Sequence, residues 1–114
     1  MGVGKAERLK KNSDFLVVLR KGRFWANELM GIRAAPTDRE ISRIGLVTSK
    51  RIGKAVIRNR VRRLLREATR PLPLVPGWDI VIIARQAAAE APYRDIEAAL
   101  RNLLERANLL GEER

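Results

Sequence analysis

A strongly basic segment, residues 50–70, places the tightest limit on how this chain can fold. Nine of its 21 residues are Lys or Arg, and Glu67 is the single acidic residue among them. Its apolar residues stand at offsets of 0, 4, 7, 8 and 11, which is the period of one helix face. They are Ile57, Val61, Leu64, Leu65 and Ala68. The pattern predicts an amphipathic helix that buries this face and presents arginines on the other.

Arginines cover the opposite face of this predicted helix. They are Arg58, Arg62, Arg63, Arg66 and Arg70. Like charges three and four residues apart repel each other along a helix, whereas the fixed phosphates of a nucleic acid would neutralise them. The planar guanidinium also suits pairs of phosphate oxygens. A solvated surface helix is the alternative, but such a face normally mixes both signs of charge, so nucleic-acid binding is the better interpretation.

Composition narrows the possible functions. The 114 residues carry a net charge of +11, and 46% of them are hydrophobic, which is typical of one folded domain over residues 1–114. The absence of histidine and cysteine removes the usual general base, the thiol nucleophile, disulfides and the usual zinc ligands. The carboxylates are scattered, so we expect no catalytic residue and no metal site in the protein itself.

The distribution of apolar residues also bears on location. No apolar run is long enough to span a bilayer, and the N-terminus lacks the apolar core of a secretory signal. The basic helix lacks the Trp or Phe that interfacial membrane helices carry on their apolar side. We therefore expect a cytoplasmic protein with no membrane partner.

Hydrophobic periodicity and chain-breaking residues predict the order helix, strand, strand, strand, helix, strand, helix. The first helix is predicted from an Asn12 or Ser13 cap to Gly22, the basic helix after Gly53, and the last helix from Pro92 to Gly111. Strands are predicted at residues 24–26, 29–35, 41–48 and 78–84. This order indicates an α+β fold with a four-stranded mixed sheet and three helices. By the general rule, the crossover through the basic helix would be right-handed.

Three spaced motifs resemble the protein subunit of bacterial ribonuclease P. The central one is Lys50-Arg51-Ile52-Gly53-Lys54-Ala55-Val56, followed by Arg58-Asn59-Arg60 and by residues 62–67. The others are Arg8-Leu9-Lys10-Lys11 with Asp14-Phe15, and the strand at residues 79–85. The resemblance extends from about Arg8 to Ala107, and the spaced central set is specific, whereas Arg-Asn-Arg alone would be weak.

The resemblance implies a function in which the protein is not the catalyst. In this family an RNA removes the 5′ leader from precursor tRNA with Mg²⁺, and the protein binds that catalytic RNA and contacts the leader. The protein itself needs no cofactor. The family fold is a two-layer sandwich with a left-handed crossover, like a domain of ribosomal protein S5. We adopt this handedness in preference to the general rule.

The resemblance also assigns residues to two binding roles. The leader cleft maps onto Phe15, Leu19, Gly31 and Arg33, with Arg58, Asn59 and Arg62 at its edge. Binding of the catalytic RNA maps onto Lys50, Arg51, Lys54, Arg58, Asn59, Arg60, Arg62, Arg63 and Arg66. This chain departs from the family, because aromatic residues are common where Leu19 and Arg33 stand and Gly31 has no side chain. Arg33 can replace an aromatic ring through guanidinium stacking or a phosphate contact, and Phe15 can be either a leader contact or a core residue.

Two other functions remain as alternatives. A ribosomal or assembly protein would bind structural RNA with the same fold, and stimulation of precursor-tRNA cleavage at low Mg²⁺ would distinguish it. A DNA-binding protein would place Arg58–Arg66 in a major groove. No helix-turn-helix spacing precedes that helix, so we do not expect DNA as the partner.

Overall fold

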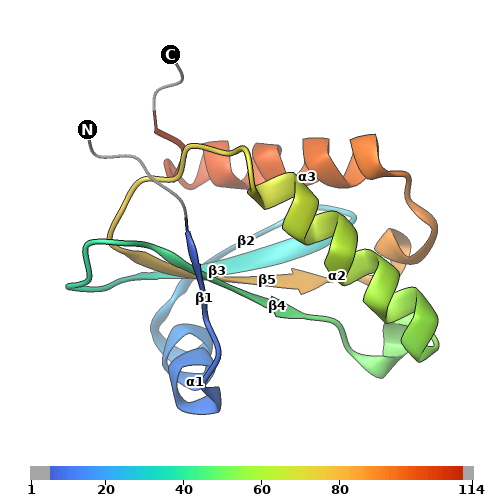
Figure 1. Ribbon diagram of the computed structural model, residues 1–114, viewed down its shortest axis with the longest axis horizontal. Coiled ribbons are helices and arrows are strands. Elements are labelled where there is room, and N and C mark those ends of the chain that lie inside the picture. The colour runs from blue at the N-terminus through green and yellow to red at the C-terminus, as the bar shows by residue number, and fades with distance from the viewer. Residues whose placement is uncertain (1–5, 112–114) are drawn as a thin grey trace.

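A five-stranded sheet separates one helix on its lower face from two helices on its upper face in the computed structural model, which describes residues 6–111 (Figure 1). The strands are β1 (Glu7–Arg8), β2 (Arg23–Ala26), β3 (Met30–Pro36), β4 (Arg43–Val47) and β5 (Trp78–Ala84). The helices are α1 (Asn12–Lys21), α2 (Ala55–Thr69) and α3 (Tyr93–Arg106), with short 3-10 helices η1 (Lys50–Ile52) and η2 (Gln86–Glu90). Strand order across the sheet is β1-β4-β5-β3-β2.

The predicted order of elements is confirmed, but the predicted count of four strands is wrong by one. The additional strand, β1, pairs in parallel with β4 through Glu7↔Arg43 and Arg8↔Ile44. Two flanking hydrogen bonds hold it, from the Glu7 N–H to the Ser42 carbonyl (2.8 Å) and from the Leu9 N–H to the Ile44 carbonyl (2.9 Å). A two-residue strand is too short to show alternating polarity, so only the folded chain reveals it.

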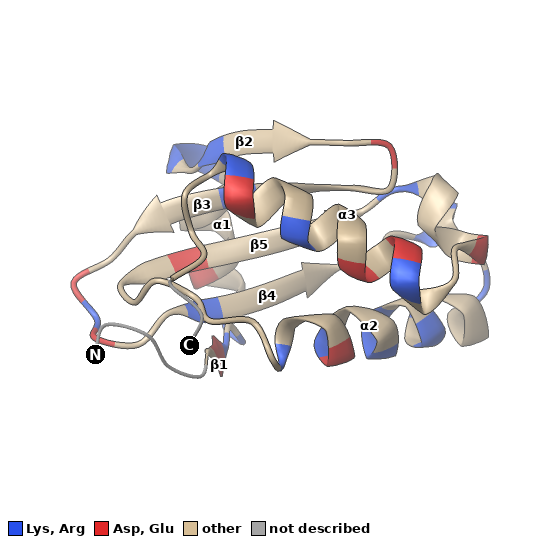
Figure 2. Cartoon of the chain, turned by 90° about the horizontal axis from the view of Figure 1, so that it is seen from above, with Lys and Arg blue, Asp and Glu red and all other residues tan. Residues whose placement is uncertain are grey.

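The crossover between the parallel strands β4 and β5 is left-handed, as the family resemblance implied. Figure 2 views the sheet from the side of α2 and α3, and β4 and β5 run in the same direction, with β5 on the left for an observer looking along them. The chain passes from β4 through α2 on the observer's side before it enters β5. The right-handed geometry of the general rule is therefore wrong for this fold.

Both faces of the sheet are covered, which explains the dense apolar sequence of β5. Ile80 and Ile82 are fully buried in the main core under α2 and α3, whereas Val81 points to the other face and packs with Leu9 and Val18 under α1. Alternate residues of one strand thus enter two different cores. Phe15 and Leu19 pack at the edge of the smaller core.

Two helix ends differ from prediction. Helix α1 begins at Asn12, one residue earlier than a cap at Asn12 or Ser13 would allow, and no side chain caps it. Helix α3 ends at Arg106 rather than Gly111, because Asn108 adopts a left-handed conformation with φ 59°. The Asn108 N–H then donates to the Glu105 carbonyl and the Leu109 N–H to the Leu104 carbonyl, a Schellman ending in which Asn replaces glycine.

An ion-pair network fixes α1 to the sheet. Arg43 on β4 donates through Nε and Nη2 to the carboxylate of Asp79 on β5, at 2.9 and 2.6 Å. Its Nη1 donates to Asp14 in the first turn of α1, at 3.2 Å. Arg43 and Asp79 are almost completely buried. The hydrogen bond with Asp79 is the main reason that the pKa of Arg43 is raised, so the bidentate pair is the stronger part of the network.

Candidate nucleic-acid interface

Helix α2 presents the basic surface, and its apolar stripe decides which way the arginines point. Val61, Leu64, Leu65 and Ala68 are buried against the main core, so the other side of the helix faces solvent. Figure 2 shows lysines and arginines distributed along α2, whereas most of the acidic residues in the upper layer lie on α3. The predicted amphipathic helix is therefore confirmed, with its basic face exposed.

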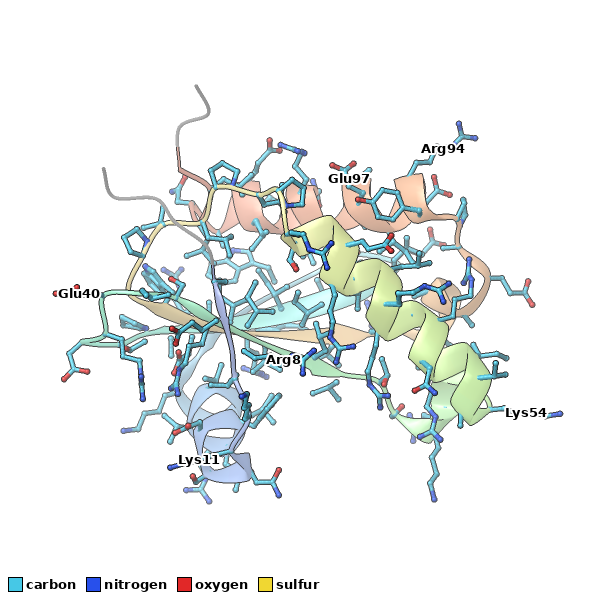
Figure 3. All side chains as sticks on the ribbon, in the orientation of Figure 1. Arg8, Lys11, Glu40, Lys54, Arg94 and Glu97 are labelled. Atoms are coloured by element: carbon cyan, nitrogen blue, oxygen red, sulfur yellow. The ribbon has the colours of Figure 1, made fainter. Side chains whose placement is uncertain are left out.

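A cavity of about 380 Å³ lies between the second half of α2 and the edge formed by β1 and β4. Four arginines line it, and its apolar lining includes Phe15 and Leu46. The arginines are Arg8, Arg62, Arg66 and Arg70. Figure 3 shows the Arg8 side chain extending from β1 toward α2. Positive charge above an apolar floor is the arrangement that accepts a phosphate together with a base or sugar.

These four arginines have no ion-pair partner among residues 6–111, although Glu7 also lines the cavity. Burial lowers the pKa of Arg66, and the positive charges of Arg8 and Arg62 lower it further. Crowded guanidinium groups repel one another, and an anion placed among them would relieve that repulsion. The electrostatics of the cavity therefore favour an anionic ligand.

A second cavity, of about 480 Å³, continues along α1 and is lined by Phe15, Leu19 and Val47 among others. The two cavities share Phe15 and Leu46, and we call them together the β4 groove. Phe15 lies directly on Gly45 of β4, where any Cβ would overlap the ring atoms. The glycine thus allows an aromatic ring to approach the strand closely at the centre of the groove.

The residues assigned to the leader do not all meet in one cavity. Phe15 and Leu19 line the β4 groove, and Arg62 lies at its α2 end. Gly31 and Arg33 lie on the same sheet face as α1, but on β3, and they line neither cavity. Arg58 and Asn59 also line neither. Asn59 accepts a hydrogen bond from Arg62 Nη1 at 2.9 Å, which links it to the rim of the groove.

The residues assigned to the catalytic RNA lie along η1 and α2, and most are exposed, whereas Arg58, Arg60 and Arg62 are partly buried. Lys50, Arg51 and Lys54 lead into the helix, and Figure 3 shows Lys54 projecting away from the fold. Arg63 is exposed like Arg66. Arg60 instead donates to the carbonyls of Ala89 (3.2 Å) and Ala91 (2.9 Å), so it ties α2 to the η2–α3 connection.

Arg8 and Phe24, which the sequence assigned to no site, lie on this surface or near it, and Arg70 of the predicted basic face joins Arg8. Arg8 and Arg70 complete the arginine cavity, and the signal for Arg8 was available only through the pairing of β1. Phe24 on β2 is half exposed and lies beside Arg33. A phenylalanine in a predicted strand carries no sign of exposure, so sequence periodicity could not identify it.

Neither a protein-held metal site nor a membrane span is evident in the described part of the chain. Within residues 6–111, no group of three or more His, Cys, Asp or Glu side chains could hold a metal ion. Asp14 and Asp79 both bind Arg43. Over the same residues, none of the helices has both the length and the apolarity required to cross a membrane.

Comparison with known proteins identifies the family. The family model described as Ribonuclease P matches residues 3–108. The ribonuclease P protein component of Clostridioides difficile (strain 630) is 39% identical over 112 residues, covering 96% of this chain and 98% of the relative. That of Roseiflexus sp. (strain RS-1) is 46% identical over 109 residues, covering 93% of this chain and 89% of the relative.

Solved structures agree with the sequence comparison. The ribonuclease P protein of Staphylococcus aureus superposes with a TM-score of 0.82 at 31% identity, covering 94% of this chain and all of the other. The protein from Thermotoga maritima gives a TM-score of 0.78 at 31% identity, covering 88% of this chain and 96% of the other. The chain, with its five-stranded sheet, three helices and basic α2 surface, therefore belongs to the ribonuclease P protein family.

Proposed function

We propose that residues 1–114 form one RNA-binding domain that serves as the protein component of ribonuclease P, the enzyme that removes the 5′ leader from precursor tRNA. The observation that carries this proposal is the arginine cavity with Phe15 at its floor, in a chain of this family. Its bacterial relatives support a cytoplasmic role in tRNA maturation. Catalysis resides in the RNA subunit, together with the Mg²⁺ that this RNA binds.

The basic α2 surface supports contact with the catalytic RNA. We assign Lys50, Arg51, Lys54, Arg58, Asn59, Arg62, Arg63 and Arg66 to this contact, with Arg60 orienting the η2–α3 connection beside it. Each guanidinium that meets a phosphate releases condensed counterions and lowers the repulsion between RNA segments. The protein thereby reduces the concentration of Mg²⁺ that the RNA needs to fold and to hold its substrate.

The β4 groove supports contact with the single-stranded leader. Arg62 and Arg66 at one end suit backbone phosphates, and the Phe15 ring offers a face on which a base can stack. Leu19 and Val47 extend the apolar wall. Because stacking and phosphate contacts do not depend on base identity, this groove would accept leaders of many sequences.

Reconstitution tests the proposed function. The purified chain, added to a bacterial ribonuclease P RNA at low Mg²⁺, is expected to restore accurate 5′ cleavage of precursor tRNA that the RNA alone performs poorly. The same protein without RNA is expected to cleave nothing, because it lacks histidine and cysteine and the buried carboxylate of Asp79 is paired with Arg43. RNA binding without any stimulation would favour the ribosomal or assembly alternative, and cleavage by RNA-free protein would contradict the proposal.

Replacement of Phe15 tests the groove. Phe15→Ala is expected to weaken precursor-tRNA binding by about 1–3 kcal/mol, the range for one lost base stack, and to leave mature-tRNA binding unchanged. Since Phe15 is only half buried, we expect a loss of unfolding free energy of about 1–3 kcal/mol, below that of a fully buried Phe. Affinities for both tRNAs and a thermal melt measure these effects.

The conservative variant separates stacking from packing. Phe15→Leu keeps most of the contact with Leu9 and Val18 in the smaller core but removes the aromatic face. It is expected to retain stability and still to lose part of the preference for precursor over mature tRNA. A large loss of stability with an unchanged preference in both variants would show that Phe15 is a core residue alone.

A further inference from the structure

Phe24 is a large apolar side chain on β2 that the fold leaves 51% exposed. Its ring lies against Gly31 of the neighbouring strand β3. A Cβ at Gly31 would stand 2.8 Å from Cε1 of Phe24 and 3.0 Å from its Cζ, closer than packed carbon atoms approach. The absence of a side chain at position 31 therefore lets the Phe24 ring rest on the sheet.

Arg33, two residues along β3, is held beside this ring. Its Cζ is 4.8 Å from the centroid of Phe24, within the range of a cation–π contact. Its Nη1 also donates a hydrogen bond to the Gly22 carbonyl at 3.2 Å. Two independent contacts thus fix a partly buried guanidinium plane, so little side-chain entropy remains to be lost when a ligand binds it.

The surroundings of this pair are cationic. Arg20 and Lys21 lie in the last turn of α1, whereas Arg23 points to the other face of the sheet, where its Cζ lies 5.4 Å from the Trp25 ring centroid. None of these residues, nor Arg33, has an ion-pair partner within residues 6–111. An exposed aromatic ring among unpaired cations is complementary to a nucleotide, which carries both a flat base and a phosphate, rather than to an uncharged apolar partner.

The sheet register connects this pair to the β4 groove. Val47, Ile83 and Gly31 are neighbours across β4, β5 and β3, and they form one row on the α1 face. Val47 and Ile83 are partly exposed, and the Phe24 ring covers the Gly31 end of the row. From strand spacing, the row spans roughly 10 Å from Val47 to Gly31. That distance is suited to one or two extended nucleotides beyond Phe15 and Leu19.

We propose that Phe24 and Arg33 form a second stacking platform that binds one nucleobase of the precursor-tRNA leader, at the β2 end of this row. The inference rests on the proposed function, because it takes the single-stranded leader as the occupant. It adds Phe24 to the residues assigned to the leader. It also gives the glycine at position 31 a structural role, because the ring of Phe24 occupies the space of a side chain there and supplies the aromatic surface.

The first experiment measures precursor- and mature-tRNA affinities of holoenzyme reconstituted with a ribonuclease P RNA. Phe24→Leu is expected to weaken precursor binding roughly 5- to 150-fold, the range for one base stack, and to leave mature-tRNA binding unchanged. Phe24→Tyr is expected to retain wild-type affinity. Gly31→Ala should lower precursor affinity with little change in melting temperature, because the added methyl displaces only the far end of the Phe24 side chain.

A leader with one abasic nucleotide identifies base stacking directly. We expect one leader position where base removal weakens binding to wild-type holoenzyme but has no further effect with Phe24→Leu. Tyr93→Leu, which alters a partly exposed aromatic on α3, on the opposite side of the sheet from α1, is the matched control and should retain wild-type affinities. Arg33→Lys keeps the charge without the plane and should behave like Phe24→Leu.

The outcomes separate this inference from the proposed function. Unchanged precursor affinity in both Phe24→Leu and Gly31→Ala would overturn the second platform. If wild-type holoenzyme still preferred precursor over mature tRNA in that case, the proposed leader contact would stand without Phe24. If wild-type holoenzyme showed no such preference, the leader contact and this inference would both be overturned.

Discussion

Arg43→Met is expected to lower the free energy of unfolding by about 3–5 kcal/mol, the range for removing one partner of a buried ion pair. Asp79 is only 8% exposed, and it would lose both guanidinium hydrogen bonds. Asp14 has 30% of its side chain exposed, so water can replace its contact. Because small domains are stable by about 5–15 kcal/mol, the loss should be evident in a urea titration.

A double variant distinguishes the stability lost through an unpaired Asp79 carboxylate from the stability lost through poorer packing. Arg43→Met with Asp79→Leu removes both charges, and it is expected to recover most of the lost stability, since an apolar pair can replace a buried ion pair at little cost. Asp14→Asn is the matched control and should cost less than about 1 kcal/mol. A double variant less stable than Arg43→Met, or an Arg43→Met protein as stable as the wild type, would contradict this account.

The pH dependence of the Arg43 contribution follows from the raised pKa of its guanidinium. A group whose pKa is higher in the folded state stabilises the fold fully below its ordinary pKa, and this contribution is lost only as pH rises through the raised value. For arginine both values lie above the range in which proteins are studied. The guanidinium should therefore not titrate in a stability profile between neutral and moderately alkaline pH.

Local sequence patterns predicted the helices and strands that bury long runs of apolar residues. The apolar period of α2 and the β-branched run of β5 each place several residues in a core, so the pattern is strong enough to read without the fold. The ends of elements depend on single residues instead. Asn108 ends α3 because it tolerates a left-handed backbone while Leu109 turns back into the core. Sequence alone favoured Gly111 as the helix end because glycine is the residue most common at that position.

Local sequence patterns could not predict contacts between segments that are distant in the chain. Pairing of β1 with β4 brings Arg8 beside α2, and nothing in the residues around Arg8 indicates that neighbour. Gly45 and Gly31 each provide space for an aromatic ring from another element, whereas in sequence they are only glycines within strands. The handedness of the crossover came from family resemblance, because the general steric rule favours the opposite hand.

The basic face of α2 was predicted more completely than the groove beside it. Its arginines follow from the same period that fixes the buried stripe, so their exposure needs no tertiary information. Arg60 is the exception, because its position on the helix lets it reach the carbonyls of Ala89 and Ala91. The division between RNA-facing and structural arginines thus depends on which elements pack near the helix.

The double variant Arg62→Ala, Arg66→Ala is expected to bind a ribonuclease P RNA roughly 10- to 30-fold more weakly than the wild type at about 0.15 M salt. Both line the arginine cavity, and neither has an acidic partner among the described residues. Two lost phosphate contacts should also reduce the slope of log K against log salt by roughly two units. Filter binding across a salt series measures both quantities.

The fold of the Arg62→Ala, Arg66→Ala protein should be at least as stable as that of the wild type. Burial lowers the pKa of Arg66, and the positive charges of Arg8 and Arg62 lower it further, so in the free protein these groups repel, and truncation relieves the repulsion. The matched control removes two exposed arginines elsewhere, Arg39 in the β3–β4 turn and Arg94 on α3. It changes net charge equally, and it should leave the salt slope nearly unchanged. Equal slopes for wild type and both double variants would mean that the α2 surface is solvated and binds no phosphate.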